Sequence, residues 1–292
     1  MSLWKGKSRG NKTGYQIFLW VLKRFGVLPA YFLLRFVVLY FFLFSWRSSR
    51  QIYSLYHKKL GYGRMASIFK IYRNYYLLGQ SIIDKVVVMS GIKNNFTYNF
   101  DGEENLMEIV SRQKGAVLLS AHIGNWDIAG HLFKRLNTRI HIVMFDGEQE
   151  QIKKYLDSVT GKKSINIIVI KNDLSHIYQI SDALKNNELV CIHADRFLDG
   201  NKTFSANFLG EKARFPMGPF VLASAFKVPV SFVFAVKENN MHYHFFASGI
   251  KNYEYLEKEA AMQEMLLDFT REMEMKVKRY PEQWFNYYNF WN

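Results

Sequence analysis

"AVLLSAHIGNWDIAG", residues 116–130, predicts a buried strand that ends in a tight turn and continues into a helix. The first six residues form an apolar run of strand length. Gly124 permits backbone angles that other residues avoid, and Asn125 is a residue type that often caps a helix. His122 therefore falls at the carboxyl end of the predicted strand, and Asp127 follows five residues later.

Strands and helices alternate from about residue 91 onward. Further strands are expected at 140–146, 165–171 and 188–195, and a strand pair at 228–248 with its turn at 238–240. Further helices are expected at 101–115, 147–161, 174–187 and 254–278. Such alternation is typical of an α/β fold with a largely parallel central sheet flanked by helices. Active sites in such sheets lie beyond the carboxyl ends of the strands.

A second histidine has an acidic residue at the same spacing, and its setting differs from that of His122. His141 is followed five residues later by Asp146. His141 lies inside a predicted strand, where positions five apart point to opposite faces and Asp146 is about 16 Å further along. His141 and Asp146 are therefore excluded as a catalytic pair, whereas a turn can bring His122 beside Asp127.

The pair formed by His122 and Asp127 can support acid–base chemistry. The Asp127 carboxylate would keep one imidazole nitrogen protonated and leave the other as a general base. The start of the following helix would offer N–H groups to a developing oxyanion. The alternative is a capped turn whose histidine is only hydrogen-bonded within the fold.

The single cysteine, Cys191, excludes an intrachain disulfide framework and any zinc site built from several cysteines. Cys191 lies in the predicted strand at 188–195 and is expected to be a small core residue rather than a nucleophile. His193, on the same strand, is expected to be a hydrogen-bonded core histidine.

Basic residues are concentrated at the amino terminus. The first 83 residues contain 14 Lys and Arg and no acidic residue, whereas the remainder holds 25 residues of each sign. Such asymmetry indicates an anionic partner. The apolar stretch Val27–Trp46 would be about 30 Å long as a helix. It therefore favours an anionic membrane surface over nucleic acid.

The mode of membrane association stays open at this point. Arg35 in the middle of the apolar stretch is costly inside a bilayer, and basic residues flank both ends. The helix could span the membrane or lie in its surface, and a buried helix of a soluble protein is the alternative. The chain is accordingly divided into a basic, aromatic-rich, helical membrane-associating region, 1–85, and an α/β domain, 86–292.

Four motifs, taken in order, resemble one enzyme family. "SAHIGNWDIAG" resembles the His-x4-acid motif of glycerolipid acyltransferases, and more closely that of the late acyltransferases of lipid A biosynthesis. "CIHADRF", residues 191–197, is similar to a family strand that ends in an Asp-containing turn. "ANFLGEKARFPMGPFVLASAFKVPV", residues 206–230, and "YPEQWFNYYNFW", residues 280–291, resemble the later motifs. The resemblance covers about residues 115–291.

That resemblance implies transfer of a fatty acyl group from acyl carrier protein, or from acyl-CoA, to a lipid hydroxyl without a metal or cofactor. It also implies that His122 deprotonates the hydroxyl and that Asp127 orients His122. The substrate-binding residues expected from it are Gly124, Asn125, Asp195, Arg196 and Arg214. The two arginines would bind phosphate. The expected location is the cytoplasmic side of the bacterial inner membrane.

Two departures from the family pattern leave the acceptor lipid open. The closing motif continues as "NYYNFW" where the family has a basic run, and Asp127 stands where lipid A enzymes commonly have glutamate. The acceptor is therefore lipid A or another lipid with a free hydroxyl. Two alternatives come from other classes of protein. One is a catalytically inactive membrane-binding module that kept the fold, and the other, which the apolar stretch argues against, is a nucleic-acid binder.

Overall fold

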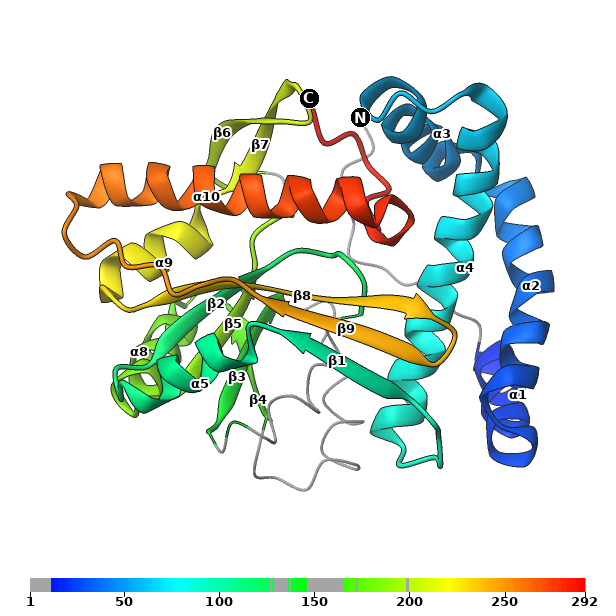
Figure 1. Cartoon of the computed structure of the whole chain (residues 1–292), viewed down its shortest axis with the longest axis horizontal. Helices are drawn as coiled ribbons and strands as arrows, with labels where there is room; N and C mark the ends of the chain where they lie inside the picture. The colour runs from blue at the N-terminus through cyan, green and yellow to red at the C-terminus, as the bar shows by residue number, and fades with distance from the viewer. Residues whose placement is uncertain are drawn as a thin grey trace.

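A mixed sheet forms the centre of the fold in the computed structural model, which describes residues 12–125, 128, 136, 138–145, 165–171, 173–197 and 200–291. Its strands are β1 (Thr97–Asp101), β2 (Ala116–Ser120), β3 (Ile140–Phe145), β4 (Ile165–Ile170), β5 (Leu189–His193), β8 (Val230–Asn239) and β9 (His242–Ala247). They follow the order β1-β9-β8-β2-β5-β3-β4 (Figure 1). Among the described strands of this main sheet, only β8 and β9 pair antiparallel, and all other neighbours pair parallel. The predicted α/β fold with a largely parallel sheet is confirmed.

The helices occupy both sides of this sheet and the amino-terminal end of the chain. They are α1 (Lys12–Phe25), α2 (Val27–Phe44), α3 (Trp46–Ser54), the π-helix η1 (Leu55–Lys59), α4 (Arg64–Met89), α5 (Glu103–Ser111), α8 (Ser175–Lys185), α9 (Gly218–Phe226), α10 (Lys258–Arg279) and the 3-10 turn η5 (Pro281–Gln283). Figure 1 shows α10 along one side of the sheet and α5 and α8 on the other. The helices expected directly after Asn125 and at 147–161 lie outside the described residues.

Two strand features depart from the expected pattern. The helix expected at 101–115 starts later than predicted, because Asp101 ends β1 and α5 begins only at Glu103. A separate antiparallel hairpin, β6 (Thr203–Phe208) with β7 (Glu211–Pro216), stands outside the main sheet. The expected pair at 228–248 forms β8 and β9, and the last helix begins four residues later than predicted and ends one residue later.

Strand β2 lies in the middle of the sheet, with the parallel neighbours β8 and β5 on its two sides. All five of its residues are buried, as expected for a strand covered on both faces. Its side chains belong to a hydrophobic core that continues without a break into α2 and α4. The division predicted after residue 85 falls inside α4, which ends at Met89. A functional division between membrane-associating and catalytic parts stays a prediction.

Helix α2 packs along α4 at close range. Gly79 of α4 lies under the side chain of Leu34, where any larger residue would overlap it. The contact buries one side of α2, whereas Arg35 and most of the large apolar side chains on its other side stay exposed. Among the described residues, α2 is the one helix long and apolar enough to cross a membrane, and 28% of that stretch is buried.

A buried ion pair joins α4 to the sheet. The ammonium of Lys237 on β8 donates to the carboxylate of Asp84, and also to the hydroxyls of Tyr31 and Tyr243 at 2.8 and 3.3 Å. Both tyrosine hydroxyls donate to Asp84 in turn. Burial lowers the pKa of Lys237, and the charge of Asp84 opposes that shift. The network connects α2, α4, β8 and β9 through fully enclosed polar groups.

Replacing Lys237 by Met should destabilise the protein by about 3–5 kcal/mol, because Asp84 would be left buried without its cation. Urea unfolding in a mild detergent measures the loss. The matched control is Lys278→Met on α10, whose pair with Glu274 is largely exposed and should change stability by less than about 0.5 kcal/mol. Equal unfolding midpoints for the two variants would show that the buried pair does not stabilise the fold.

Candidate active site

The register between β2 and β5 sets the position of the site. These strands are parallel neighbours in which Ser120 lies opposite His193. The Ala194 N–H donates to the Ser120 carbonyl at 2.8 Å, so the ladder continues past the end of β5. Two residues beyond each strand come His122 and Asp195. Equal offsets from an in-register pair place these two side chains next to each other at the carboxyl edge of the sheet.

His122 and Asp195 are joined by two hydrogen bonds. The His122 Nδ1–H donates to Asp195 Oδ1 at 2.6 Å, and the His122 main-chain N–H donates to Oδ2 at 2.9 Å. The Asp195 side chain is 1% exposed and that of His122 is 20% exposed. Because a carboxylate can only accept, Nδ1 carries the hydrogen and Nε2 carries the lone pair. His122 is therefore oriented as a general base.

Neighbouring charged groups keep Asp195 ionised although its carboxylate is buried. Burial raises the pKa of the Asp195 carboxyl, but the charge and hydrogen bond of His122, together with Arg196, bring that pKa well below its ordinary value. Asp195 was expected among the substrate-binding residues, and the structure instead places it on His122. Asp127, the expected partner, lies outside the described residues, so its role stays a prediction.

His193 stacks beside the catalytic candidate. Its ring centroid lies 4.4 Å from that of His122, with the planes 30° apart. Burial, with the nearby His122, lowers the pKa of His193 to about 3, so its ring stays neutral. A neutral histidine inside the fold agrees with the expected core role, although the side chain is only half-buried.

His122, His193 and Asp195 offer donor atoms within 4.8 Å of one another, the kind of set that can hold a metal ion. Imidazole lone pairs lie in the ring planes, and zinc sits about 2.0–2.1 Å from each nitrogen. Coordination through His122 Nδ1 would displace the hydrogen that this nitrogen donates to Asp195 Oδ1 at 2.6 Å. The arrangement therefore fits hydrogen bonding between His122 and Asp195 better than joint coordination of an ion.

The second His–acid spacing has a structural explanation. His141 lies within β3, and its Nε2 contacts Glu188 Oε2 at 2.6 Å, next to Arg139. Asp146 lies outside the described residues. The prediction that His141 lies inside a strand is confirmed. Its imidazole is hydrogen-bonded to Glu188 on a neighbouring segment.

Gly124 and Asn125 shape the loop that carries His122. Gly124 has a φ of +69° and lies against the Ala235 carbonyl, where a Cβ atom would overlap. The Asn125 side chain donates to the Ser81 carbonyl of α4 at 3.1 Å, and to the Tyr243 hydroxyl at 3.4 Å. Both residues were expected to bind substrate, and the contacts described for them are within the protein.

The N–H groups of residues 122–125 are all engaged. They donate in order to Asp195 Oδ2 and to the carbonyls of Ala121, Gln283 and Ala235, at 2.7–2.9 Å. None of these four is available to stabilise an oxyanion. In the expected following helix, the Ile128 N–H donates to the Asn125 carbonyl at 3.3 Å. The residues between Asn125 and Ile128 lie outside the described part of the chain, so oxyanion binding by the start of this helix stays a prediction.

Two arginines and the single cysteine were also singled out in the sequence. Arg196 is half-buried and donates to the Phe285 carbonyl, next to Asp195. Arg214 is exposed on β7, where it donates to Thr203 Oγ1 at 3.1 Å and lies over the Phe197 ring. Cys191 is on β5, and burial raises the pKa of its thiol to about 12. That pKa argues against a thiolate nucleophile.

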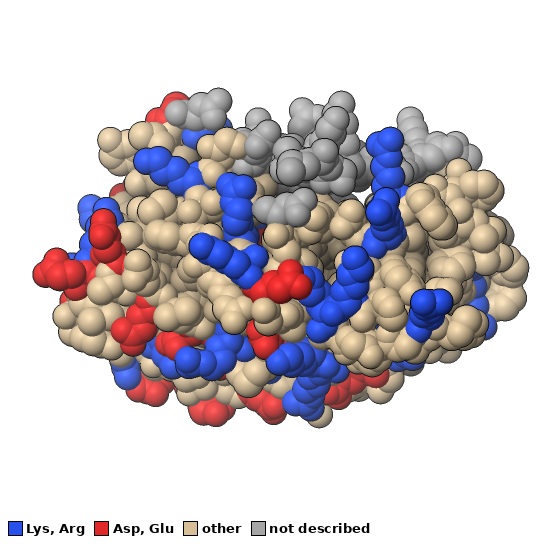
Figure 2. Space-filling model, turned by 90° about the horizontal axis from the view of Figure 1, so that it is seen from above, with Lys and Arg blue, Asp and Glu red and all other residues tan. Residues whose placement is uncertain are grey.

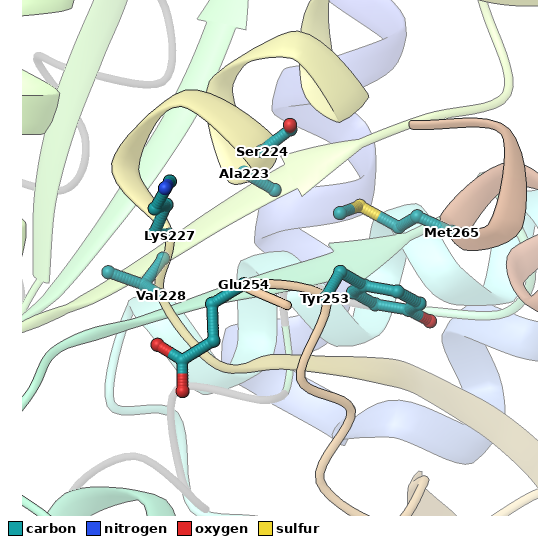
Figure 3. Close-up of a pocket in the computed structure, with 7 residues that line it drawn as sticks. All are labelled: Ala223, Ser224, Lys227, Val228, Tyr253, Glu254 and Met265. Carbon is teal, nitrogen blue, oxygen red and sulfur yellow. The ribbon is translucent and has the colours of Figure 1, made fainter. Parts of the chain in front are cut away.

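A small pocket lies at the other end of the sheet. Its lining includes Ser224 and Lys227 at the end of α9, Tyr253 and Glu254 on the segment after β9, and Met265, which points toward α9 in Figure 3. The pocket borders the segment just before Val230, which pairs with Val117 near the start of β2. His122 follows the end of β2, about 16 Å further along the strand direction. The pocket is therefore separate from the pair of His122 and Asp195.

Comparison with known proteins identifies a family. The family profile described as "Bacterial lipid A biosynthesis acyltransferase" matches residues 75–292. Phosphatidylinositol mannoside acyltransferase from two strains of Mycobacterium tuberculosis is 29% identical over 126 residues, which is 42% of this chain and 39% of the relative's length. The crystal structure of the 1-acyl-sn-glycerophosphate acyltransferase PlsC from Thermotoga maritima is 12% identical, with a TM-score of 0.42 over 84% of this chain and 95% of that one.

Substituting Gly124 by Ala should destabilise the protein by about 1–3 kcal/mol more than Gly210→Ala, because the new methyl group overlaps packed backbone. Gly210 also has a positive φ but faces open space, so its variant isolates the cost of the backbone angle. Chemical denaturation of both variants measures the difference. Similar unfolding free energies would contradict the close approach between Gly124 and Ala235.

Proposed function

The chain belongs to the bacterial lipid A biosynthesis acyltransferase family, and on that basis we propose that it moves a fatty acyl group from a thioester to a lipid hydroxyl. The donor is acyl carrier protein or acyl-CoA. The observation that carries this mechanism is the hydrogen bond from His122 Nδ1 to Asp195, which leaves Nε2 as the proton acceptor. The phosphatidylinositol mannoside acyltransferase of M. tuberculosis is one relative with the same class of activity in its name.

The reaction needs one base that later acts as an acid. Nε2 of His122 takes the proton of the acceptor hydroxyl as its oxygen attacks the thioester carbonyl carbon. The carbon–sulfur bond then breaks, and the proton passes from His122 to the departing thiolate. The products are a lipid ester and a free thiol, and no acyl-enzyme forms. Asp195 stabilises the imidazolium that exists between the two transfers.

Asp127, which lies outside the described residues, enters this proposal as the carboxylate that the sequence motif pairs with His122. The sequence motif assigns it the orienting role, whereas the hydrogen bonds of the described residues support Asp195 in that role. Oxyanion stabilisation falls to groups other than the N–H donors of residues 122–125, since these are engaged. Arg214, exposed on β7, is the surface arginine that we assign to a phosphate of the acceptor or donor.

Exposed apolar side chains on α1, α2 and the start of α4 support association with a membrane. The large ones include Trp20, Phe25, Phe32, Phe36, Phe44 and Phe69. Basic side chains are interspersed with them, and acidic ones are absent before Asp84. In Figure 2 the side of the N-terminal helices is mainly blue and tan, and red gathers on the opposite side and the lower margin. An anionic lipid surface complements this combination.

We propose that α2 lies in the plane of the membrane rather than across it. One side of α2 is packed on α4, and Tyr31 in that contact reaches the buried pair of Asp84 and Lys237. A spanning α2 would therefore pull these charged groups and the sheet edge into the lipid. Basic residues at both ends of α2 also fit one headgroup layer. We place this surface on the cytoplasmic side of the bacterial inner membrane.

Loss of the base should abolish acyl transfer. In a strain lacking the gene, lipid mass spectrometry should show a missing acylated lipid and its accumulated precursor, and the normal chain should restore the product. His122→Ala should not restore it, and Asp195→Asn should lower the rate by up to about 10⁴-fold, because the wrong imidazole nitrogen would carry the hydrogen. Comparison of Asp127→Asn with the matched control Asp146→Asn measures how much the Asp127 carboxylate contributes to the rate of acyl transfer.

Normal acylation by a folded His122→Ala variant would refute the mechanism. Unchanged lipids on deletion of the gene would favour the inactive membrane-binding module instead. Circular dichroism and the melting temperature of each purified variant show whether a lost activity reflects chemistry or unfolding.

Labelling of single cysteines tests the in-plane arrangement. Lys23→Cys near the end of α1 and Arg47→Cys near the start of α3 flank α2. In a chain with Cys191→Ala, both should react with a membrane-impermeant maleimide from the same side of inner-membrane vesicles. Lys278→Cys on α10 marks the catalytic side and should label with them. Labelling of the two ends from opposite sides would show that α2 spans, and recovery of the protein in the soluble fraction would refute membrane association.

A further inference from the structure

The closing segment, Tyr280–Trp291, lies directly along the loop that carries His122. The Phe285 N–H donates to the His122 carbonyl at 3.0 Å, and the Gln283 carbonyl accepts from the Gly124 N–H at 2.8 Å. Trp284 thereby forms an antiparallel bridge with Ile123. Backbone hydrogen bonds thus fix the closing segment on both sides of His122.

The same segment also reaches Asp195. The Trp284 indole Nε1–H donates to Asp195 Oδ2 at 3.4 Å, and the Tyr288 hydroxyl donates to the Asp195 carbonyl at 3.0 Å. Oδ2 therefore accepts from the Trp284 indole and from the His122 main chain, whereas Oδ1 accepts from His122 Nδ1. Trp284 is 1% exposed, so its indole N–H has no access to water as an alternative partner.

We infer that Trp284 is a positioning residue for the acyl transfer proposed above, acting through the Asp195 carboxylate. A carboxylate rotates freely about its last bond unless its oxygens are held. Two N–H donors on Oδ2 fix the carboxylate plane, which directs Oδ1 to His122 Nδ1. Removing the indole N–H loosens the carboxylate and with it the imidazole. Small misplacements of a base reduce rates by about 10- to 100-fold.

Helix α4 holds Trp284 in place from behind. The Asn74 side-chain amide donates to the carbonyls of Glu282 and Trp284 at 3.0 and 3.2 Å, and its oxygen accepts from the Tyr287 hydroxyl at 2.9 Å. Asn74 is fully buried, and its amide is engaged on both its nitrogen and its oxygen. The indole is thus anchored by its own backbone and packed by aromatic rings, which include Phe208 and Phe290.

Trp291 provides a matched control in the same aromatic cluster. Its indole N–H donates to the Phe208 carbonyl at 3.0 Å, away from Asp195, and its ring packs edge-on against that of Trp284. Trp284→Phe and Trp291→Phe each remove one indole N–H and the same volume of side chain. Only the first variant removes a hydrogen bond from the catalytic carboxylate.

Kinetics and NMR together test the inference, which rests on the proposed function for its kinetic part. With acyl carrier protein thioester as donor and lipid extracted from the deletion strain as acceptor, Trp284→Phe should lower kcat about 10-fold or more and leave KM unchanged. Trp291→Phe should leave kcat within about twofold. In protein with ¹⁵N-labelled histidine, the signal of the His122 Nδ1 proton should move in Trp284→Phe and stay in Trp291→Phe.

Equal kcat values for the two folded variants would overturn the inference. A lower kcat in Trp284→Phe with an unmoved Nδ1 signal would also overturn it, since the residue would then act only through stability. Failure of the proposed function is recognised separately, by normal activity in His122→Ala. The NMR comparison still reports whether Trp284 holds Asp195 in that case, because it requires no substrate.

Discussion

The parallel pairing of β2 with β5 is the constraint on which the chemistry of the molecule depends. Ser120 lies opposite His193, and each strand continues two residues to a functional side chain. His122 and Asp195 therefore meet although 73 residues separate them. A slip of one residue would turn one of them to the other face of the sheet. The hydrogen bond between the Ala194 N–H and the Ser120 carbonyl extends the correct register to the edge where the two side chains meet.

Helix α4 supports both halves of this arrangement. Through Asn74 it holds the closing segment, and through the Ser81 carbonyl it holds Asn125 on the loop after His122. Through Asp84 it is bound to Lys237 on β8. The helix that carries the apolar α2 on one side therefore frames the base and its carboxylate on the other. The exposed apolar helix α2 and the candidate site therefore contact the same helix, α4, although they are far apart in the sequence.

The strands were predictable from sequence because β2, β3, β4, β5 and β8 are apolar runs of strand length. β1 alternates between exposed and half-buried residues, and β6 and β7 form a separate hairpin. None of these three strands is an apolar run, so the sequence pattern did not predict them. The position of His122 at a strand end was also predictable. Its pairing with Asp195 was not, because strand register is a tertiary property. His122 directly follows one predicted strand and Asp195 is the last residue of another, 188–195, and this shared position at strand ends is the signal that could have pointed to Asp195 as well as to Asp127.

The buried site of Lys237 has a consequence for how the protein is produced. Its ammonium is enclosed by Asp84 of α4 and Tyr31 of α2. A chain shortened to the α/β domain expected at 86–292 would lose α2 and most of α4, and with them both groups that hold this cation. The same trimming would remove the carbonyl that secures Asn125. Helix α4, which packs against the apolar α2, therefore also completes the loop that carries His122, so a preparation that keeps these helices preserves the candidate site better than truncation does.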